Sequence, residues 1–151
     1  MAEHRSSVDF DLEHFLPYRL DRLADRVSEA LARLYEHEHG LNVAQWRVLA
    51  WLHHQPQMTA KQIRDATRMD KARVSRAVQA LEGRGLVWRR PSPHDQRWHD
   101  LRLSEAGQQL MTELIPRVRE REAQLLAPLT AQERQQLLDM MARLERPLQE
   151  D

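Results

Sequence analysis

The sequence predicts a mainly α-helical fold that contains one small β-hairpin. Apolar residues recur at steps of three and four along most of the 151 residues, as is typical of amphipathic helices. Helix-capping signals precede several of these stretches. Residues 86–103 depart from this pattern, because two short alternating runs flank a turn rich in proline and polar residues. The chain should therefore fold as four helices, one hairpin and two further helices.

The first predicted helix is long. Residues 1–9 lack a pattern and are expected to form a flexible tail. From Leu12, apolar residues recur as far as Gly40, a residue type that often ends helices. Pro17 lies in the first turns, so the helix either begins or kinks there.

Three shorter helices follow. The second should span residues 43–54, where Gln55-Pro56 ends it. A capping box at residues 59–62 opens the third, and residues 67–69 form a turn. Asp70 is a suitable N-cap for the fourth helix, which should end at two glycines near residue 84. Two short helices joined by a tight turn form a helix-turn-helix.

The hairpin follows this motif directly, so it is interpreted as a wing. Residues 86–89 and 99–103 are its expected strands. Ser104 should cap a long helix over residues 105–127, which contains Pro116. A capping box at residues 130–133 opens the last helix.

Composition excludes several classes of protein. Hydrophobic residues make up 41% of the chain and charged residues 30%, which suits a core with a charged exterior. Cysteine is absent, so disulfides and thiolate chemistry are excluded. No apolar run approaches the roughly 20 residues of a membrane helix, and no signal sequence is evident. The expected protein is soluble and cytoplasmic, with no membrane association.

The zero net charge hides a division along the chain. Residues 59–103 contain eleven Lys or Arg and five Asp or Glu, a net charge of +6, and the remainder is at −6. A basic middle indicates a surface for a polyanion. Ordinary solvated charge is the alternative. Arginine supplies 21 of the 23 basic residues, which suits bidentate contact with phosphate or guanine but can also reflect genomic base composition.

The fourth helix carries the candidate base-reading residues. At 100° per residue, Val74, Ala77, Val78 and Leu81 share one stripe and should face the core. The N-terminal part of such a helix meets base edges in the major groove. The candidates on the outward side and its flanks, each of which is otherwise an ordinary solvated residue, are Arg73, Ser75, Arg76 and Gln79.

Phosphate contacts are expected from polar side chains near the ends of the two short helices. These candidates are Thr59, Lys61, Gln62, Thr67, Arg68 and Lys71. Thr59 also has a competing role as an N-cap. At the tip of the wing, Arg97 is placed to enter the minor groove, and Asp95 can hold its guanidinium or close the turn. A surface ion pair is the alternative for these two.

These motifs together resemble the MarR (multiple antibiotic resistance regulator) family of winged-helix repressors. The wing carries Asp95-Gln96-Arg97 followed by Leu101 to Gly107, "LRLSEAG", with Ser104 where the family pattern has Thr. The "LEGRGLV" run ending the fourth helix matches too, and the likeness spans residues 10 to 148. It implies a homodimer on a palindromic operator with half-sites about 34 Å apart, Arg97 in the minor groove and Asp95 as its positioner.

The resemblance also implies a domain organisation with a dimerisation region and a DNA-binding lobe. Residues 10–40 and 104–151 would form a helical dimerisation region, since their apolar stripes are too extensive for one chain to cover. Residues 41–103 would form the winged helix-turn-helix, DNA-binding lobe.

Residues 15–52 resemble a branch of that family that responds to aromatic acids or their coenzyme A thioesters. Such an effector needs an apolar slot and a cation, and it would act by favouring a spacing of the two lobes that does not fit DNA. The candidate lining residues are Phe15, Tyr18, Arg19, Trp46 and Met111. The alternatives are that these aromatics belong to the core and that Arg19 pairs with a neighbouring Asp.

Other functions lack support in the sequence. His37 and His39 point to different faces of a helix, the adjacent His53 and His54 do so too, and no zinc motif is present. We therefore expect no metal and no cofactor. Signatures of hydrolases, P-loop enzymes and dinucleotide-binding enzymes are absent. A helical dimerisation module without DNA binding would explain the terminal helices but not the basic middle or the hairpin.

Overall fold

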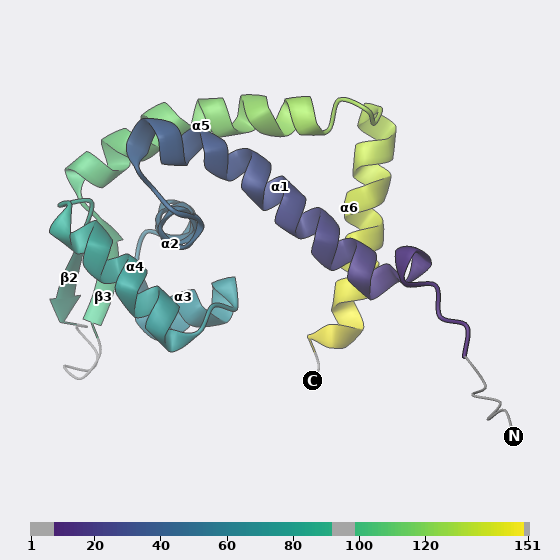
Figure 1. The fold of residues 1–151 in the computed structure, drawn as a ribbon. Coiled ribbons are helices and arrows are strands. Elements are labelled where there is room, and N and C mark those ends of the chain that lie inside the picture. The colour runs from purple at the N-terminus through teal and green to yellow at the C-terminus, as the bar shows by residue number, and fades with distance from the viewer. Residues whose placement is uncertain (1–7, 92–98, 150–151) are drawn as a thin grey trace, which may run out of the picture.

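The computed structural model describes residues 8–91 and 99–149. A compact lobe lies at one end of the molecule, and long helices extend beyond it (Figure 1). In chain order the elements are η1 (Leu12–His14), α1 (Leu16–His39), α2 (Val43–His54), β1 (Met58–Thr59), α3 (Ala60–Thr67), α4 (Lys71–Gly83), β2 (Val87–Pro91), β3 (His99–Leu103), α5 (Glu105–Leu125), α6 (Ala131–Glu145) and η2 (Arg146–Leu148). The mainly α-helical fold with a small wing is confirmed.

Local chemistry explains most of the helix boundaries. Pro17 lies in the first turn of α1, where its missing N–H costs nothing, so the helix begins at Leu16 and a separate 3-10 turn precedes it. Gly40 ends α1 with a φ of 62°, a left-handed conformation that glycine adopts without strain. Capping boxes open α2, α3 and α6. In the last of these, hydrogen bonds from Thr130 hold the pKa of Glu133 below its ordinary value.

The wing is a three-stranded sheet, which differs from the expected hairpin. The strand order is β1-β3-β2, and all neighbours are antiparallel. Met58 pairs with Leu101 on one side of β3, and Val87 pairs with Leu103 on the other. β1 has only two residues, too few for a recognisable alternation, and it is formed by pairing with a distant segment. β2 also runs to Pro91, beyond the expected residue 89.

The hydrophobic core is concentrated in the lobe. Leu49 and Leu52 of α2, Ile63 of α3 and Leu81 of α4 are fully enclosed. The C-terminal end of α1 and the first half of α5 complete this core through Ala32, Tyr35, Met111 and Leu114.

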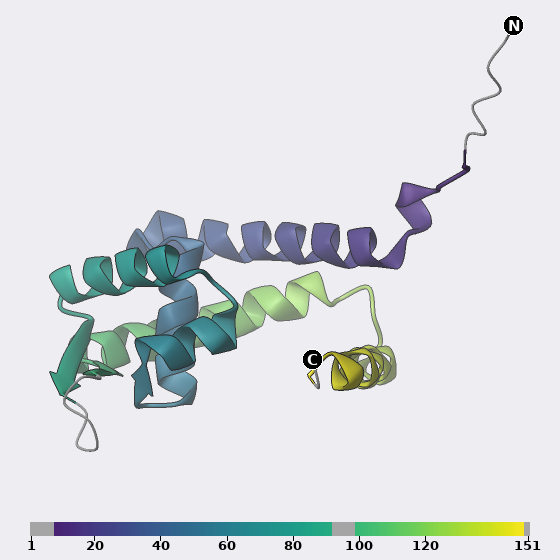
Figure 2. The ribbon, with the colours of Figure 1, turned by 90° about the horizontal axis from the view of Figure 1, so that it is seen from below.

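The outer parts of α1 and α5, together with α6, form an open frame beyond the lobe. α1 and α5 leave the lobe on the same side, and α6 turns sharply away from the end of α5 (Figures 1 and 2). α1 and α6 overlap in Figure 1 but are well separated in Figure 2. Large apolar side chains on both helices are therefore uncovered, including Leu23 at 57% exposure and Leu138 at 59%.

Candidate nucleic-acid interface

The helix-turn-helix is held by caps that position α4 on the surface of the lobe. Arg68 ends α3 in a left-handed conformation, with a φ of 58°, which lets the chain turn within three residues. The Asp70 carboxylate then accepts the Arg73 N–H at 2.8 Å and starts α4. The predicted turn at residues 67–69 and the predicted caps at Thr59 and Asp70 are confirmed.

One face of α4 is buried and the opposite face is free. Val74, Ala77, Val78 and Leu81 are each less than 4% exposed, as their spacing predicts. Ser75, Arg76 and Gln79 are exposed on the other side. These side chains can enter a major groove about 12 Å wide without a bulky obstruction.

Arg73 lies toward the flank of α4 rather than on the outward face. It is half-buried and lines two cavities that also contain Glu36 of α1. Arg47 of α2 lines one of them. The carboxylate of Glu36 thus lies in the surroundings of Arg73, whereas Arg76 remains exposed at the rim of a single cavity. Geometry favours Arg76 over Arg73 for contact with bases.

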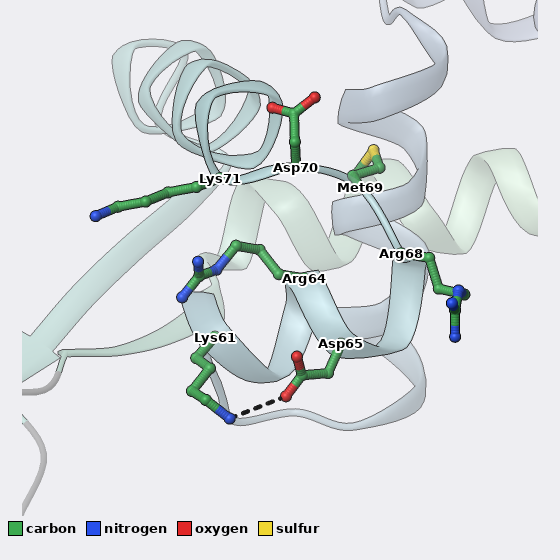
Figure 3. Close-up of a pocket in the computed structure, with 7 residues that line it drawn as sticks. All are labelled: Lys61, Arg64, Asp65, Arg68, Met69, Asp70 and Lys71. Carbon is green, nitrogen blue, oxygen red and sulfur yellow. Dashed lines mark hydrogen bonds and ion pairs between the residues drawn. The ribbon is translucent and has the colours of Figure 1, made fainter. Parts of the chain in front are cut away.

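Cationic side chains gather where α3 meets the start of α4. They surround a shallow cavity of about 550 Å³ whose lining includes four cations and two carboxylates. Lys61, Arg64 and Lys71 extend to one side of the turn, and Arg68 points to the other (Figure 3). Lys61 is paired with Asp65 at 3.2 Å, and the Asp70 carboxylate is occupied by the helix cap. The remaining positive charge suits phosphate oxygens.

Arg64 is a member of this cluster but was not among the phosphate contacts predicted from the sequence. It is half-buried, and its Nε has no hydrogen-bond partner among the described residues. It lies one turn after Lys61 on α3, so the helical spacing of three residues was the available signal.

Three of the expected phosphate contacts have other roles in the chain. The Thr59 hydroxyl accepts the Gln62 N–H, and the Gln62 side-chain oxygen accepts the Thr59 N–H. The Thr67 hydroxyl donates to the Ile63 carbonyl at 2.7 Å and accepts the Met69 N–H. These residues shape the ends of α3, and the cations of the cluster remain the stronger candidates for phosphate.

The tip of the wing, with Asp95 and Arg97, lies outside the described residues. The base of the wing is anchored to the lobe and to its own strands. Arg89 of β2 pairs with Glu82 at the end of α4 at 2.6 Å, and the Arg90 guanidinium lies 3.9 Å from the centre of the Trp88 ring. The ion pair between Arg89 and Glu82 connects the wing directly to the end of α4.

Two arginines from distant segments of the chain contact the end of α1. Arg84, directly after α4, donates to the carbonyl oxygen of His39 at 2.7 Å and also to that of Gly40. Arg117 of α5 forms an ion pair with Glu38. Neither contact was predicted, because each joins segments more than 40 residues apart.

The proposed effector residues do not lie together within one chain. Phe15, Tyr18 and Arg19 are exposed at the start of α1, whereas Trp46 stacks on Tyr35 near its end, with ring centres 5.4 Å apart. At about 1.5 Å per residue, Tyr18 and Tyr35 are about 25 Å apart along the helix. Arg19 donates to the Glu13 carbonyl at 3.2 Å.

Tyr18 and Arg19 therefore do not lie beside Trp46 within one chain. Met111 is buried in the core of the lobe. Burial, followed by the negative charge of Glu36, raises the pKa of the Tyr35 hydroxyl beside Trp46, and Arg47 partly offsets this. The apolar part of the expected effector site thus lies near Tyr35. The cation for the effector's carboxylate cannot be Arg19 of the same chain.

Within residues 8–91 and 99–149, no three His, Asp or Glu side chains converge in a way that could hold a metal ion. Among the helices described, none is both long and apolar enough to span a bilayer.

Known proteins with similar sequences and folds are transcriptional regulators, not enzymes. Residues 39–97 match the profile of the MarR family. The HTH-type transcriptional regulator YdgJ of Bacillus subtilis (strain 168) is 29% identical over 119 residues, which are 78% of this chain and 72% of that protein.

Solved structures with the same fold also belong to transcriptional regulators. A probable transcriptional regulator from Pseudomonas aeruginosa is 32% identical and superposes with a TM-score of 0.73, over 89% of this chain and 99% of that one. Sco3205, a MarR family transcriptional regulator from Streptomyces coelicolor in complex with DNA, has the same fold, with a TM-score of 0.80, 22% identity and coverage of 93% and 94% of the two chains.

Proposed function

Because the chain belongs to the MarR family of transcriptional regulators, we propose that two copies of it bind one operator in double-stranded DNA and repress transcription. The observation that carries this proposal is the free polar face of α4, bordered by the cations Lys61, Arg64 and Lys71. Arg76, Ser75 and Gln79 would read base edges, and the cations would contact phosphate. Sco3205, which shares the fold, was solved in complex with DNA, and this supports DNA binding by a chain of this fold.

The open frame of helices supports the homodimer. α1 and α6 expose Leu20, Leu23, Leu138, Met140 and Leu144, each at more than 40%. Apolar surface on this scale marks an interaction site on a folded chain. A second copy covers it most simply, with residues 10–40 and 104–151 as the dimerisation region and residues 41–103 as the DNA-binding lobe.

Two-fold symmetry sets the form of the operator. The two α4 helices would enter successive major grooves on one side of the duplex, so the half-sites should be palindromic and about 34 Å apart. Arg97 of each wing would enter the adjacent minor groove, with Asp95 positioning it. The protein would act in the cytoplasm, where its operator lies.

A small anionic aromatic molecule, such as a phenolic acid or its coenzyme A thioester, would release the repressor. Trp46 is partly exposed and stacks on the buried Tyr35, so it would supply aromatic surface to the ligand, whereas Met111 is enclosed and would have to be uncovered to contribute. Phe15, Tyr18 and Arg19 could complete such a site only from the partner's α1, because they are too distant in the same chain. Arg84 would transmit a change at the end of α1 to α4, and the Arg117–Glu38 ion pair would couple α5 to the same end of α1.

DNA binding is tested by fluorescence anisotropy with the promoter next to the gene and with a random duplex. We expect preference for the promoter and an affinity that falls steeply as salt increases. Arg76→Ala should weaken promoter binding by about 1–3 kcal/mol and relax the sequence requirement at one base pair. Equal losses on promoter and random DNA would remove Arg76 from base reading.

Effector binding is tested separately, by isothermal titration with 4-coumarate and with its coenzyme A thioester. Binding of either compound, together with a lower operator affinity, supports the proposed release. If neither compound binds, or if binding tightens the operator complex, this part of the proposal fails while DNA binding stands.

A further inference from the structure

The two lysines of the chain lie in one cavity, although ten positions separate them in the sequence. Lys61 and Lys71 stand against 21 arginines, and both line the cavity of about 550 Å³ between α3 and the start of α4. Both side chains are exposed. Arginine would contact DNA phosphate at these positions at least as well, because its planar guanidinium binds two oxygens at once. What lysine adds is a nucleophilic amine that can be acylated.

The two amines differ in their surroundings. The Lys61 ammonium donates to the Asp65 carboxylate at 3.2 Å. Lys71 is the first residue of α4, and within residues 8–91 and 99–149 no carboxylate forms an ion pair with it. The carboxylate of its neighbour Asp70 accepts the Arg73 N–H instead. Lys71 is therefore the freer of the two amines.

The same cavity offers a donor for an anion. Arg64 and Lys71 extend to the same side of the α3–α4 turn (Figure 3). The Nε of Arg64 is enclosed and has no hydrogen-bond partner in the part of the chain that the structure describes. An enclosed donor without a partner is uncommon in proteins, and a phosphate oxygen is a suitable acceptor for it. The volume is sufficient for a small phosphorylated molecule, which Arg64 would hold in the cavity that Lys71 lines.

We propose that Lys71 is an acylation site, and that the donor is a small acyl phosphate whose phosphate binds Arg64. After the ammonium has lost a proton to water, the neutral Nζ attacks the carbonyl carbon of the donor. An N–C bond forms, and the bond from that carbon to the phosphate oxygen breaks. The departing phosphate keeps the electron pair and takes the proton that the nitrogen releases, so the products are an amide and hydrogen phosphate.

Acylation of Lys71 would regulate DNA binding, and this consequence rests on the proposed function. The modification removes one positive charge from the α3–α4 cluster and leaves the amide unable to pair with a phosphate. Promoter affinity should fall, and the slope of log affinity against log salt should decrease by about 1.

The test compares two acetylating reagents on the full-length protein, acetyl phosphate and the uncharged N-hydroxysuccinimidyl acetate. Proteolysis and mass spectrometry give the acetylation rate of each lysine with each reagent. The ratio of the two rates cancels differences in exposure between lysines and reports binding of the phosphate. Arg119→Lys supplies a reference amine at an exposed position of α5, which does not line the cavity.

We expect the ratio for Lys71 to exceed that of the reference amine by at least about tenfold, because a cationic cavity concentrates an anionic reagent. Arg64→Gln should lower the ratio for Lys71 toward the reference value, whereas Arg119→Gln should leave it unchanged. Circular dichroism confirms that each variant is folded.

The regulatory consequence is measured by anisotropy with the promoter duplex, in a Lys61→Arg background that leaves Lys71 as the cavity's acetylatable amine. Treatment with acetyl phosphate should weaken promoter binding. The additional change Lys71→Arg keeps the charge but cannot be acetylated in this way, so it should abolish the effect of the treatment.

Equal ratios for Lys71 and the reference amine, or a ratio that Arg64→Gln does not lower, would overturn the acylation site. Promoter binding that is unchanged after acetylation of Lys71 would overturn its regulatory role. If the unmodified protein did not bind the promoter, the proposed function would fail instead, and the acetylation rates would still decide the acylation site.

Discussion

Gly107, at the start of α5, packs so closely on the backbone of Leu86, the residue before β2, that any side chain should disrupt the contact. A Cβ at this position would overlap the carbonyl oxygen of Leu86 and lie 3.1 Å from its carbonyl carbon and 3.4 Å from Cδ2 of Leu103. The Leu86 oxygen also accepts the Ser104 N–H at 2.9 Å, so it cannot move without loss of that bond. This contact gives a physical reason for the glycine in the "LSEAG" run.

Gly107→Ala should therefore destabilise the protein. Overpacking typically costs about 1–3 kcal/mol, and we expect the upper end because the obstruction is backbone rather than a flexible side chain. At about 2–4 °C per kcal/mol for a chain of this size, the melting temperature should fall by about 6–12 °C. The measurement is thermal unfolding by circular dichroism at a fixed protein concentration, since dimerisation makes the midpoint depend on concentration.

Gly83→Ala is the matched control. Gly83 is also helical, but a Cβ there would meet nothing within 4 Å. The same substitution should stabilise the protein by about 0.4–1 kcal/mol, because it restricts the unfolded chain. If Gly107→Ala melts with the wild type, or if both variants shift equally, the packing of α5 against Leu86 has been misjudged.

Three further predictions follow from the dimer frame, the cationic cluster and the buried tyrosine. Leu138→Glu should convert the dimer to a monomer in sedimentation velocity, whereas Gln136→Glu, on the same helix, should not; a dimeric Leu138→Glu protein would place the interface elsewhere. Arg64→Ala should reduce the slope of log affinity against log salt by about 1, with Arg143→Ala on α6 as the control, and an unchanged slope would exclude a phosphate contact. Because burial raises the pKa of Tyr35 in the folded state, its contribution to stability is complete below pH 10.0 and is lost as the pH rises through the raised value. Chemical denaturation should show that the wild type loses more stability than Tyr35→Phe above that pH, and parallel pH profiles would contradict this.

Sequence patterns were sufficient to predict the elements that depend only on residues close together in the chain. The caps at Thr59, Asp70 and Thr130 lie where expected, since each depends on residues three positions apart. The buried stripe of α4 follows directly from helical geometry. Pro17 left two possibilities, and the helix begins beside it rather than kinking there.

Features that depend on distant segments could not be predicted. β1 exists only because Met58 and Thr59 meet β3 about 40 residues later. The stacking of Trp46 on Tyr35, rather than near Tyr18, depends on where α2 packs along α1, which no local pattern reveals. Arg84 carries no pattern that would reveal its bonds to the end of α1.

The most direct test of the proposed function is the stoichiometry of the complex with promoter DNA, measured by sedimentation equilibrium with a labelled duplex. Two chains on each palindromic duplex are expected, with assembly lost when the half-site spacing is changed by about five base pairs, half a helical turn. A single bound chain, or binding that does not depend on that spacing, would contradict the presentation of two α4 helices to one operator.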